Sequence, residues 1–264
     1  GGLFPFIHMN PVETAPERHL VICGWTADMA TLIREILEAN PDWSAGDIAL
    51  VAPIGEDQAR ELTEMHGLSG IKVIREEAFH ESALEKASIR SAAKVLVLAN
   101  ASDSDASPTE VDARTIMTMM TIERVAPHVY KIAEMLDPSF SSYLKLADVD
   151  EIVHPREYSR FLLAGITASP GLSHTVYDLL TVDTPCVLTT VPIPDEFVGR
   201  PFGDLFRHFD EVPGDRHICI GVLENTGNIQ SLRRRAKIEA QKSPRYSEMV
   251  QNLNRVKELS SNLP

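Results

Sequence analysis

The stretch that decides the fold is His19–Trp25, with the sequence HLVICGW, in which an apolar run ends at a single glycine. A short, uninterrupted apolar run is typical of a parallel strand that is covered on both faces. The segment therefore predicts a strand that turns into a helix, the unit with which a dinucleotide-binding domain begins. Apolar residues recur behind it at helical spacing, namely Met29, Leu32, Ile33, Ile36 and Leu37.

The turn after this strand lacks the glycines that a dinucleotide needs. Such a turn reads G-x-G-x-x-G, because bare backbone must approach a pyrophosphate at the N-terminus of the helix. Here Gly24 is kept, but Thr26 and Met29 stand at the second and third glycine positions. Ala52–Pro53 stands where the second strand would end in a ribose-binding acid. We therefore expect the architecture of the fold without tight NAD binding.

The composition argues against several classes of protein. A net charge of −13 over 264 residues disfavours a nucleic-acid face and suits cations or a basic partner. Cys23, Cys186 and Cys219 lie in apolar, strand-like runs, which indicates buried, reduced thiols in a cytosolic setting. No apolar run reaches the length of about 18 residues that a membrane span needs, so we expect no direct membrane insertion. The sequence also lacks a nucleophile turn, an HExxH motif and a Walker loop, which predicts that it is not an enzyme.

Residues 18–155 alternate between strand and helix signals. This alternation predicts an α/β fold with a Rossmann-like, doubly wound parallel sheet, helices on both of its faces and right-handed crossovers. Further strands are predicted at Ile48–Ala52, Ile71–Ile74, Ala93–Ala99, Val129–Ala133 and Glu151–His154. The helices between them are predicted at Glu56–Met65, Ser82–Ala87, Thr109–Val125 and Phe140–Leu146.

The pattern changes after this region. Two amphipathic helices, Glu157–Ala168 and Ser173–Leu180, have no strand to cover, which favours packing against a partner. Their apolar stripe, Phe161, Leu162 and Ile166, is the predicted interface. The predicted segments are a linker at 1–17, the sheet domain at 18–155, a helix-turn-helix dimerisation segment at 156–182 and a small α+β C-terminal lobe with a helical tail at 183–264. In this tail, Arg233–Arg235 is either a solvated helix face or a contact with an acidic neighbouring subunit.

Several motifs taken together resemble the RCK domain, the regulator of conductance of potassium. These are HLVICGW, LEKASIRSAAKVLVLA, VYKIAEM and LADVDEIVHP, followed by the helix pair, and the resemblance covers about residues 18–225. The ICGW turn is more similar to the calcium-gated channel branch and to plant nuclear-envelope ion channels than to nucleotide-binding transporter subunits. The resemblance implies a gating module on the cytoplasmic side of the cell membrane. Such modules form a homodimer or an octameric ring and act on a membrane-embedded channel pore.

Acidic residues follow the strands at the carboxyl edge of the predicted sheet, where open α/β sheets bind ligands. Asp103 and Asp105 follow the fourth strand, and Glu134 and Asp137 follow the fifth. The resemblance places Glu134 where calcium-gated relatives carry a chelating glutamate; Leu136 replaces the second acid, and Asp137 could substitute for it. Because Ca²⁺ takes six to eight oxygen ligands, we predict a Ca²⁺ site at these four carboxylates. The alternatives are a solvated, helix-capping loop for the first pair and an ion-paired carboxylate for Glu134.

Two other functions remain open from the sequence. One is an NAD- or nucleotide-binding regulatory subunit of a potassium transporter, which a pore sequence ahead of Gly1 would distinguish from a channel domain. The other is a degenerate Rossmann oxidoreductase or sensor, which would have to bind a dinucleotide without the glycines of the fingerprint. The channel module is the preferred interpretation.

Overall fold

The computed structural model describes residues 19–99, 106–181, 188, 190–191, 193–210 and 218–222. The described chain falls into two compact units, of which the first ends at Phe161 and the second holds the described residues from Leu162 to Val222. Most of the predicted C-terminal lobe, with Arg233–Arg235, lies outside the described residues, and so does the predicted linker. The four predicted segments of the chain therefore stay predictions.

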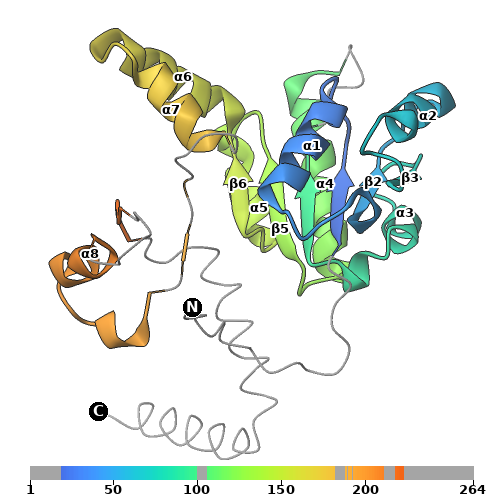
Figure 1. Ribbon diagram of the computed structural model, residues 1–264. Helices are drawn as coiled ribbons and strands as arrows, with labels where there is room; N and C mark the ends of the chain where they lie inside the picture. Colours follow the sequence, from blue (N-terminus) through green and yellow to red (C-terminus); the bar gives the residue numbers. More distant parts are fainter. Residues whose placement is uncertain are drawn as a thin grey trace, which may run out of the picture. The chain divides into compact units, whose positions relative to one another are not determined.

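Six parallel strands form one sheet in the described part of the first unit, in the order β3-β2-β1-β4-β5-β6 (Figure 1). The register places Leu20 of β1 opposite Ile48 of β2 and Lys94 of β4. The order reverses between β1 and β4, as in a doubly wound, Rossmann-like fold. These are the strands that the sequence predicts, with small differences at their ends. Their bounds are β1 Leu20–Cys23, β2 Ile48–Val51, β3 Lys72–Ile74, β4 Lys94–Val97, β5 Tyr130–Glu134 and β6 Glu151–Val153.

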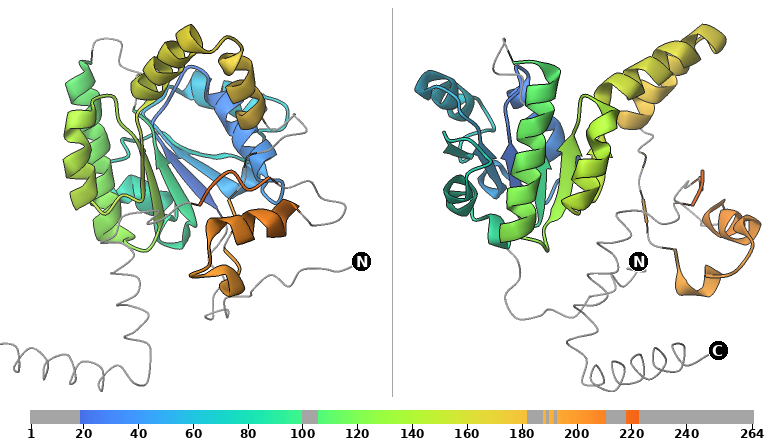
Figure 2. Two further views of the ribbon diagram at one scale, coloured as in Figure 1. Left: turned by 90° about the vertical axis from the view of Figure 1, so that its left-hand side faces the viewer. Right: turned by 180° about the vertical axis from the view of Figure 1, so that it is seen from behind.

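Helices cover both faces of the sheet (Figure 2). Leu20 and Ile22 of β1 belong to the core layer under α1 and α2, whereas Val21 and Cys23 belong to the layer under α3, α4 and α5. All four side chains are buried, so the strand is covered on both faces, as its apolar sequence predicts. The helices are α1 Met29–Ala39, α2 Glu56–Glu64, α3 Glu81–Lys86, α4 Pro108–Val125, α5 Ser141–Leu146, α6 Pro155–Ala168, α7 Leu172–Leu180 and α8 Phe202–Asp210. Short 3₁₀ helices lie at Ala45–Asp47 (η1), Ile89–Ser91 (η2), Pro138–Phe140 (η3) and Asp195–Phe197 (η4).

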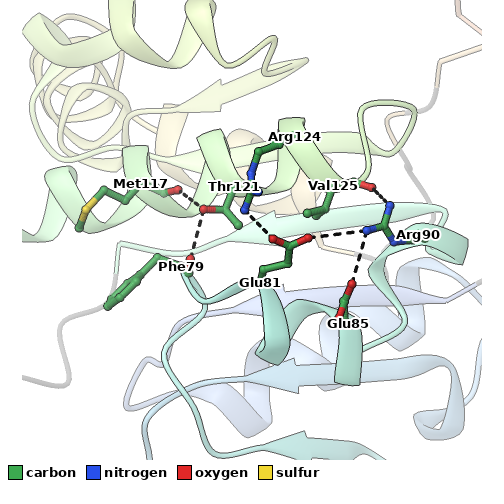
Figure 3. Close-up of polar contacts among 8 residues, drawn as sticks. All are labelled: Phe79, Glu81, Glu85, Arg90, Met117, Thr121, Arg124 and Val125. Atoms are coloured by element: carbon green, nitrogen blue, oxygen red, sulfur yellow. Dashed lines mark hydrogen bonds and ion pairs between the residues drawn. The ribbon is translucent and has the colours of Figure 1, made fainter.

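A polar cluster fastens α3 to the C-terminal end of α4 (Figure 3). The Glu81 carboxylate pairs with Arg124 at 2.6 Å and with Arg90 at 3.7 Å. Arg90 also donates a hydrogen bond of 2.8 Å to the carbonyl of Val125, the last residue of α4. A cation at this end of a helix satisfies the free carbonyls and interacts favourably with the helix dipole. The cluster therefore stabilises the end of α4 that is remote from the carboxyl edge of the sheet.

The second unit contains α7, α8 and the C-terminal half of α6. A Cβ atom added at Gly165 on α6 would lie 2.6 Å from Cδ2 of Leu172 on α7, so the two helices pack closely at this glycine. They are joined by a turn in which Gly171 has a φ of 90°, a conformation that favours glycine. Within the described ranges, no helix has both the length and the apolar character that crossing a membrane requires.

Candidate functional site

The crevice at the carboxyl ends of β1 and β4 is where a doubly wound sheet would hold a dinucleotide. Here it contains a cavity of only about 20 Å³, lined by residues that include Gly24, Pro53, Arg114 and Thr115. Ligand pockets for cofactor-sized molecules have volumes of roughly 300–1,000 Å³. Gly24 has a φ of 103°, so the tight turn after β1 is kept although its further glycines are replaced. The cavity between the described residues of this crevice is therefore far smaller than a pocket that holds a cofactor-sized molecule.

Cys23 lies at the same crevice and is a structural thiol. It is buried in the core layer under α4, and this burial raises the pKa of its thiol to about 12. A thiol with this pKa stays protonated near neutral pH and is a poor nucleophile. The prediction of a buried thiol is confirmed for Cys23, whereas Cys219 is only half-buried and that expectation is wrong. Cys186 lies outside the described residues.

Glu134 connects the carboxyl ends of β4 and β5. It is the last residue of β5, and its Oε2 accepts a hydrogen bond of 2.9 Å from the backbone N–H of Ala99, which follows β4. The side chain is half-buried. The hydrogen bond orients the carboxylate and fixes Ala99, the second residue of the connection between β4 and α4.

Asp137 lies in the loop between β5 and α5 and caps the short helix η3. Its carboxylate accepts a hydrogen bond of 2.9 Å from the N–H of Ser139, and hydrogen bonding to Ser139 holds the pKa of this exposed acid below its ordinary value. Asp103 and Asp105 lie outside the described residues. Among the residues that are described, no three His, Cys, Asp or Glu side chains gather into a group that could hold a metal. The predicted Ca²⁺ site of four carboxylates therefore stays a prediction.

A capping box fixes the start of α4 after the loop that carries Asp103 and Asp105. The Ser107 hydroxyl accepts a hydrogen bond from the N–H of Glu110, and the Glu110 carboxylate accepts one of 2.7 Å from the N–H of Ser107. Hydrogen bonding to Ser107 also holds the pKa of Glu110 below its ordinary value. The cap of α4 is thus Ser107 and not one of the two aspartates.

Asp112 is the residue of this edge that the sequence reasoning missed. It lies on α4 and is fully buried, and its two carboxylate oxygens accept hydrogen bonds from the backbone N–H groups of Leu136 and Asp137, at 2.8 and 2.9 Å. It therefore anchors the loop after β5 to α4. The sequence offers one signal for this role, because Asp112 lies among the positions of α4 that face the core, between Val111 and Thr115.

The helix pair α6–α7 exposes its apolar side chains. None of the residues of α6 or α7 is buried in the described structure, and Phe161 is 62% exposed, whereas Leu162 and Ile166 are half-buried. Leu163 and, on α7, Tyr177 and Leu180 are also exposed. The role of Phe161, Leu162 and Ile166 as an interface stays a prediction.

A second set of exposed apolar side chains lies on the helices that cover the sheet. Met117 and Met120 on α4 and Tyr143 and Leu146 on α5 are all exposed. Large apolar side chains that are exposed together commonly mark an interaction surface. The described part of the first unit therefore exposes large apolar side chains on α4 and on α5.

Comparison with known proteins indicates the same class of fold as the strand order. Residues 15–133 match the model of the slowpoke-like RCK domain of calcium-activated potassium channels. The human SLO3 gating ring, a solved structure, superimposes with a TM-score of 0.51 over 73% of this chain and 37% of that chain, at 17% identity. At this identity the superposition shows the fold alone.

Two curated relatives are channels by name. The calcium-gated potassium channel TvoK of Thermoplasma volcanium is 22% identical over 170 residues, which are 64% of this chain and 46% of TvoK. The ion channel CASTOR of Lotus japonicus is 26% identical over 187 residues, which are 67% of this chain and 21% of CASTOR. The chain thus spans less than half the length of either protein. The family match over β1–β4 and most of β5, together with the strand order, shows that the parallel-sheet domain of this chain is similar to an RCK domain.

Proposed function

We propose that this chain is the cytosolic, ligand-sensing gating module of a potassium or other cation channel, at the cytoplasmic side of the cell membrane. The observation that carries the proposal is an RCK-like sheet domain that continues, after β6, into a helix pair with exposed apolar side chains. TvoK, a relative over 64% of this chain, is a potassium channel by name. In such a module, an effector opens a pore only by binding the open arrangement more tightly than the closed one.

The exposed apolar surfaces support self-association into a ring. A two-fold dimer needs one surface that is complementary to itself, and a closed ring of dimers needs a second, separate surface. The helix pair, with Phe161, Leu162 and Ile166, supplies the first. The surface on α4 and α5, with Met120 and Leu146, supplies the second. A homodimer that assembles into an octameric ring uses both surfaces.

The effector in this proposal is a divalent cation, with Ca²⁺ as the first choice. Its ligands are Asp103, Asp105, Glu134 and Asp137 at the carboxyl edge. The hydrogen bond from Ala99 to Glu134 supports this role, because a metal ligand is commonly oriented by a second hydrogen-bonding partner. The name of TvoK, a calcium-gated channel, points to the same cation. The small crevice and the protonated Cys23 support a module without a dinucleotide and without an enzymatic reaction.

Thermal unfolding of the chain tests the proposed effector. CaCl₂, MgCl₂, NaCl, NAD and ATP are added separately, and a ligand present at 100 times its Kd adds about 2.7 kcal/mol to the free energy of unfolding. We expect Ca²⁺ to raise Tm and NAD to leave it unchanged. A rise in Tm with NAD and none with Ca²⁺ contradicts the proposal and favours a nucleotide-binding transporter subunit. Light scattering across the concentration range tests self-association separately.

A further inference from the structure

His154 lies at the junction of three elements of the first unit. It directly follows β6, and its carbonyl accepts hydrogen bonds from the N–H groups of Glu157 and Tyr158 in the first turn of α6. Its half-buried ring reaches the loop between β5 and α5, where Nδ1 lies 3.2 Å from the carbonyl oxygen of Met135 and Nε2 lies 3.2 Å from Oγ of Ser141. One side chain therefore links the end of β5, the start of α5 and the start of α6.

The partners of the ring determine where its protons must be. The Met135 carbonyl can only accept, so the contact requires a proton on Nδ1. The Ser141 hydroxyl lies 2.6 Å from the carbonyl of Pro138, to which it donates its proton, so it offers Nε2 only lone pairs. An imidazolium, which carries protons on both nitrogens, makes all three hydrogen bonds at once. A neutral ring with Nδ1–H makes only two, because Ser141 must either leave Pro138 or lose its contact with Nε2.

From this geometry we infer that His154 is a proton-sensitive joint between the β5–α5 loop and α6. The protonated ring holds the start of α6 to the loop through both nitrogens, and deprotonation releases one of the three hydrogen bonds. Histidine is the side chain whose protonation ordinarily changes between about pH 5 and pH 8. The inference goes beyond the proposed function, because the ligand here is a proton and the joint does not require a bound cation.

Charged groups on the surrounding elements act on this ring with both signs. Glu157 on α6, Asp137 in the loop and Asp112 on α4 favour the imidazolium, although Glu157 is paired with Arg160 at 2.9 Å. The N-terminal end of α6 disfavours it, because the helix dipole places partial positive charge there. Arg156 at the start of α6 and Lys145 on α5 also oppose a positive ring, whereas Glu134 at the end of β5 and Glu151 on β6 favour it. The hydrogen-bond count, and not the net charge, distinguishes the two states.

Nuclear magnetic resonance of the imidazole nitrogens in the full chain tests the proton positions directly. We expect the protonated ring of His154 to carry protons on both nitrogens, and the neutral ring to carry its proton on Nδ1. A neutral ring with its proton on Nε2, facing Ser141, overturns the inference. This measurement uses the unmutated protein, so it does not depend on whether a variant folds.

Hydrogen exchange tests whether the joint acts on α6. After correction for the intrinsic effect of pH, we expect the amides of Glu157 and Tyr158 to exchange roughly fivefold faster at about pH 8 than at about pH 6, which corresponds to one lost hydrogen bond. His154→Gln should abolish this difference. The matched control is His128→Gln, because His128 also contacts a backbone carbonyl, that of Arg90, but is remote from α6 in the sequence and contacts η2. Equal corrected rates in the wild type, or a difference that persists in His154→Gln, contradicts the joint.

Discussion

Replacing Asp112 by asparagine should release the loop after β5 while it leaves the shape of the side chain almost unchanged. Asp112 is fully buried, and each of its oxygens accepts one backbone N–H, from Leu136 and from Asp137. The asparagine carbonyl can still accept one of these hydrogen bonds. Its NH₂ group then faces the second backbone N–H, and two donors cannot pair.

The cost of this change follows from its two parts. A hydrogen bond to a charged acceptor contributes about 2 kcal/mol, and a buried donor without a partner costs about 1–2 kcal/mol more. We therefore expect Asp112→Asn to lower the free energy of unfolding by about 3–4 kcal/mol. If the free energy of unfolding falls by about 2 kcal/mol per molar urea, the midpoint of urea unfolding should fall by about 1.5–2 M.

Asp137→Asn is the matched control. It makes the same change, from a carboxylate to an amide, in the loop that Asp112 anchors. Asp137 is exposed, its hydrogen bond goes to nearby Ser139, and asparagine can still cap η3, so we expect a change within about 0.5 kcal/mol. Hydrogen exchange at the amides of Leu136 and Asp137 locates the effect. The reasoning is refuted if Asp112→Asn destabilises no more than the control, or if both amides keep their protection in the variant.

Three further experiments test other parts of the structure. Lys131→Met should lower the free energy of unfolding, measured with urea, by about 3 kcal/mol, because it removes the buried ammonium group 2.8 Å from the Glu123 carboxylate. Adding Glu123→Leu should restore part of this loss, and no recovery contradicts an ion-pair explanation. Phe161→Asp combined with Leu162→Asp should convert dimers to monomers in light scattering with little change in Tm, and a monomeric wild type refutes the interface. Glu134→Gln should weaken Ca²⁺ binding at least tenfold in calorimetry without unfolding the domain, and unchanged affinity places the cation elsewhere.

The sheet was predictable because its strands are apolar and its central strands, β1 and β2, are buried on both faces. Runs such as HLVICGW and AKVLVLA have no polar alternation, and short helical segments separate them, so parallel pairing was the consistent interpretation. The element ends were less accurate, since Pro108 begins α4 one position earlier than expected and a 3₁₀ turn precedes α5. The capping box at Ser107 explains the first difference, because proline is well suited to the first position of a helix.

The carboxyl edge was predictable in position but not in contacts. Sequence periodicity indicates which strand ends lie side by side, and it correctly brings Glu134 to the end of β5 beside β4. It does not reveal that an acid points inward to bind backbone N–H groups. Asp112 therefore drew no prediction, and the role of His154 was equally hidden, because both depend on backbone partners that are distant in the sequence.

The polar backbone of this edge pairs with carboxylates of the chain itself. In a dinucleotide-binding sheet, backbone N–H groups at the carboxyl edge bind the negative charge of a phosphate. Here carboxylates of the chain bind such groups instead: Glu134 binds the N–H of Ala99, and Asp112 binds those of Leu136 and Asp137. An anionic ligand would meet these fixed negative charges and would find the donors already paired, whereas a cation would be attracted to the same edge. The internal hydrogen bonds thus favour a cationic effector over a nucleotide, independently of the residues missing from the turn.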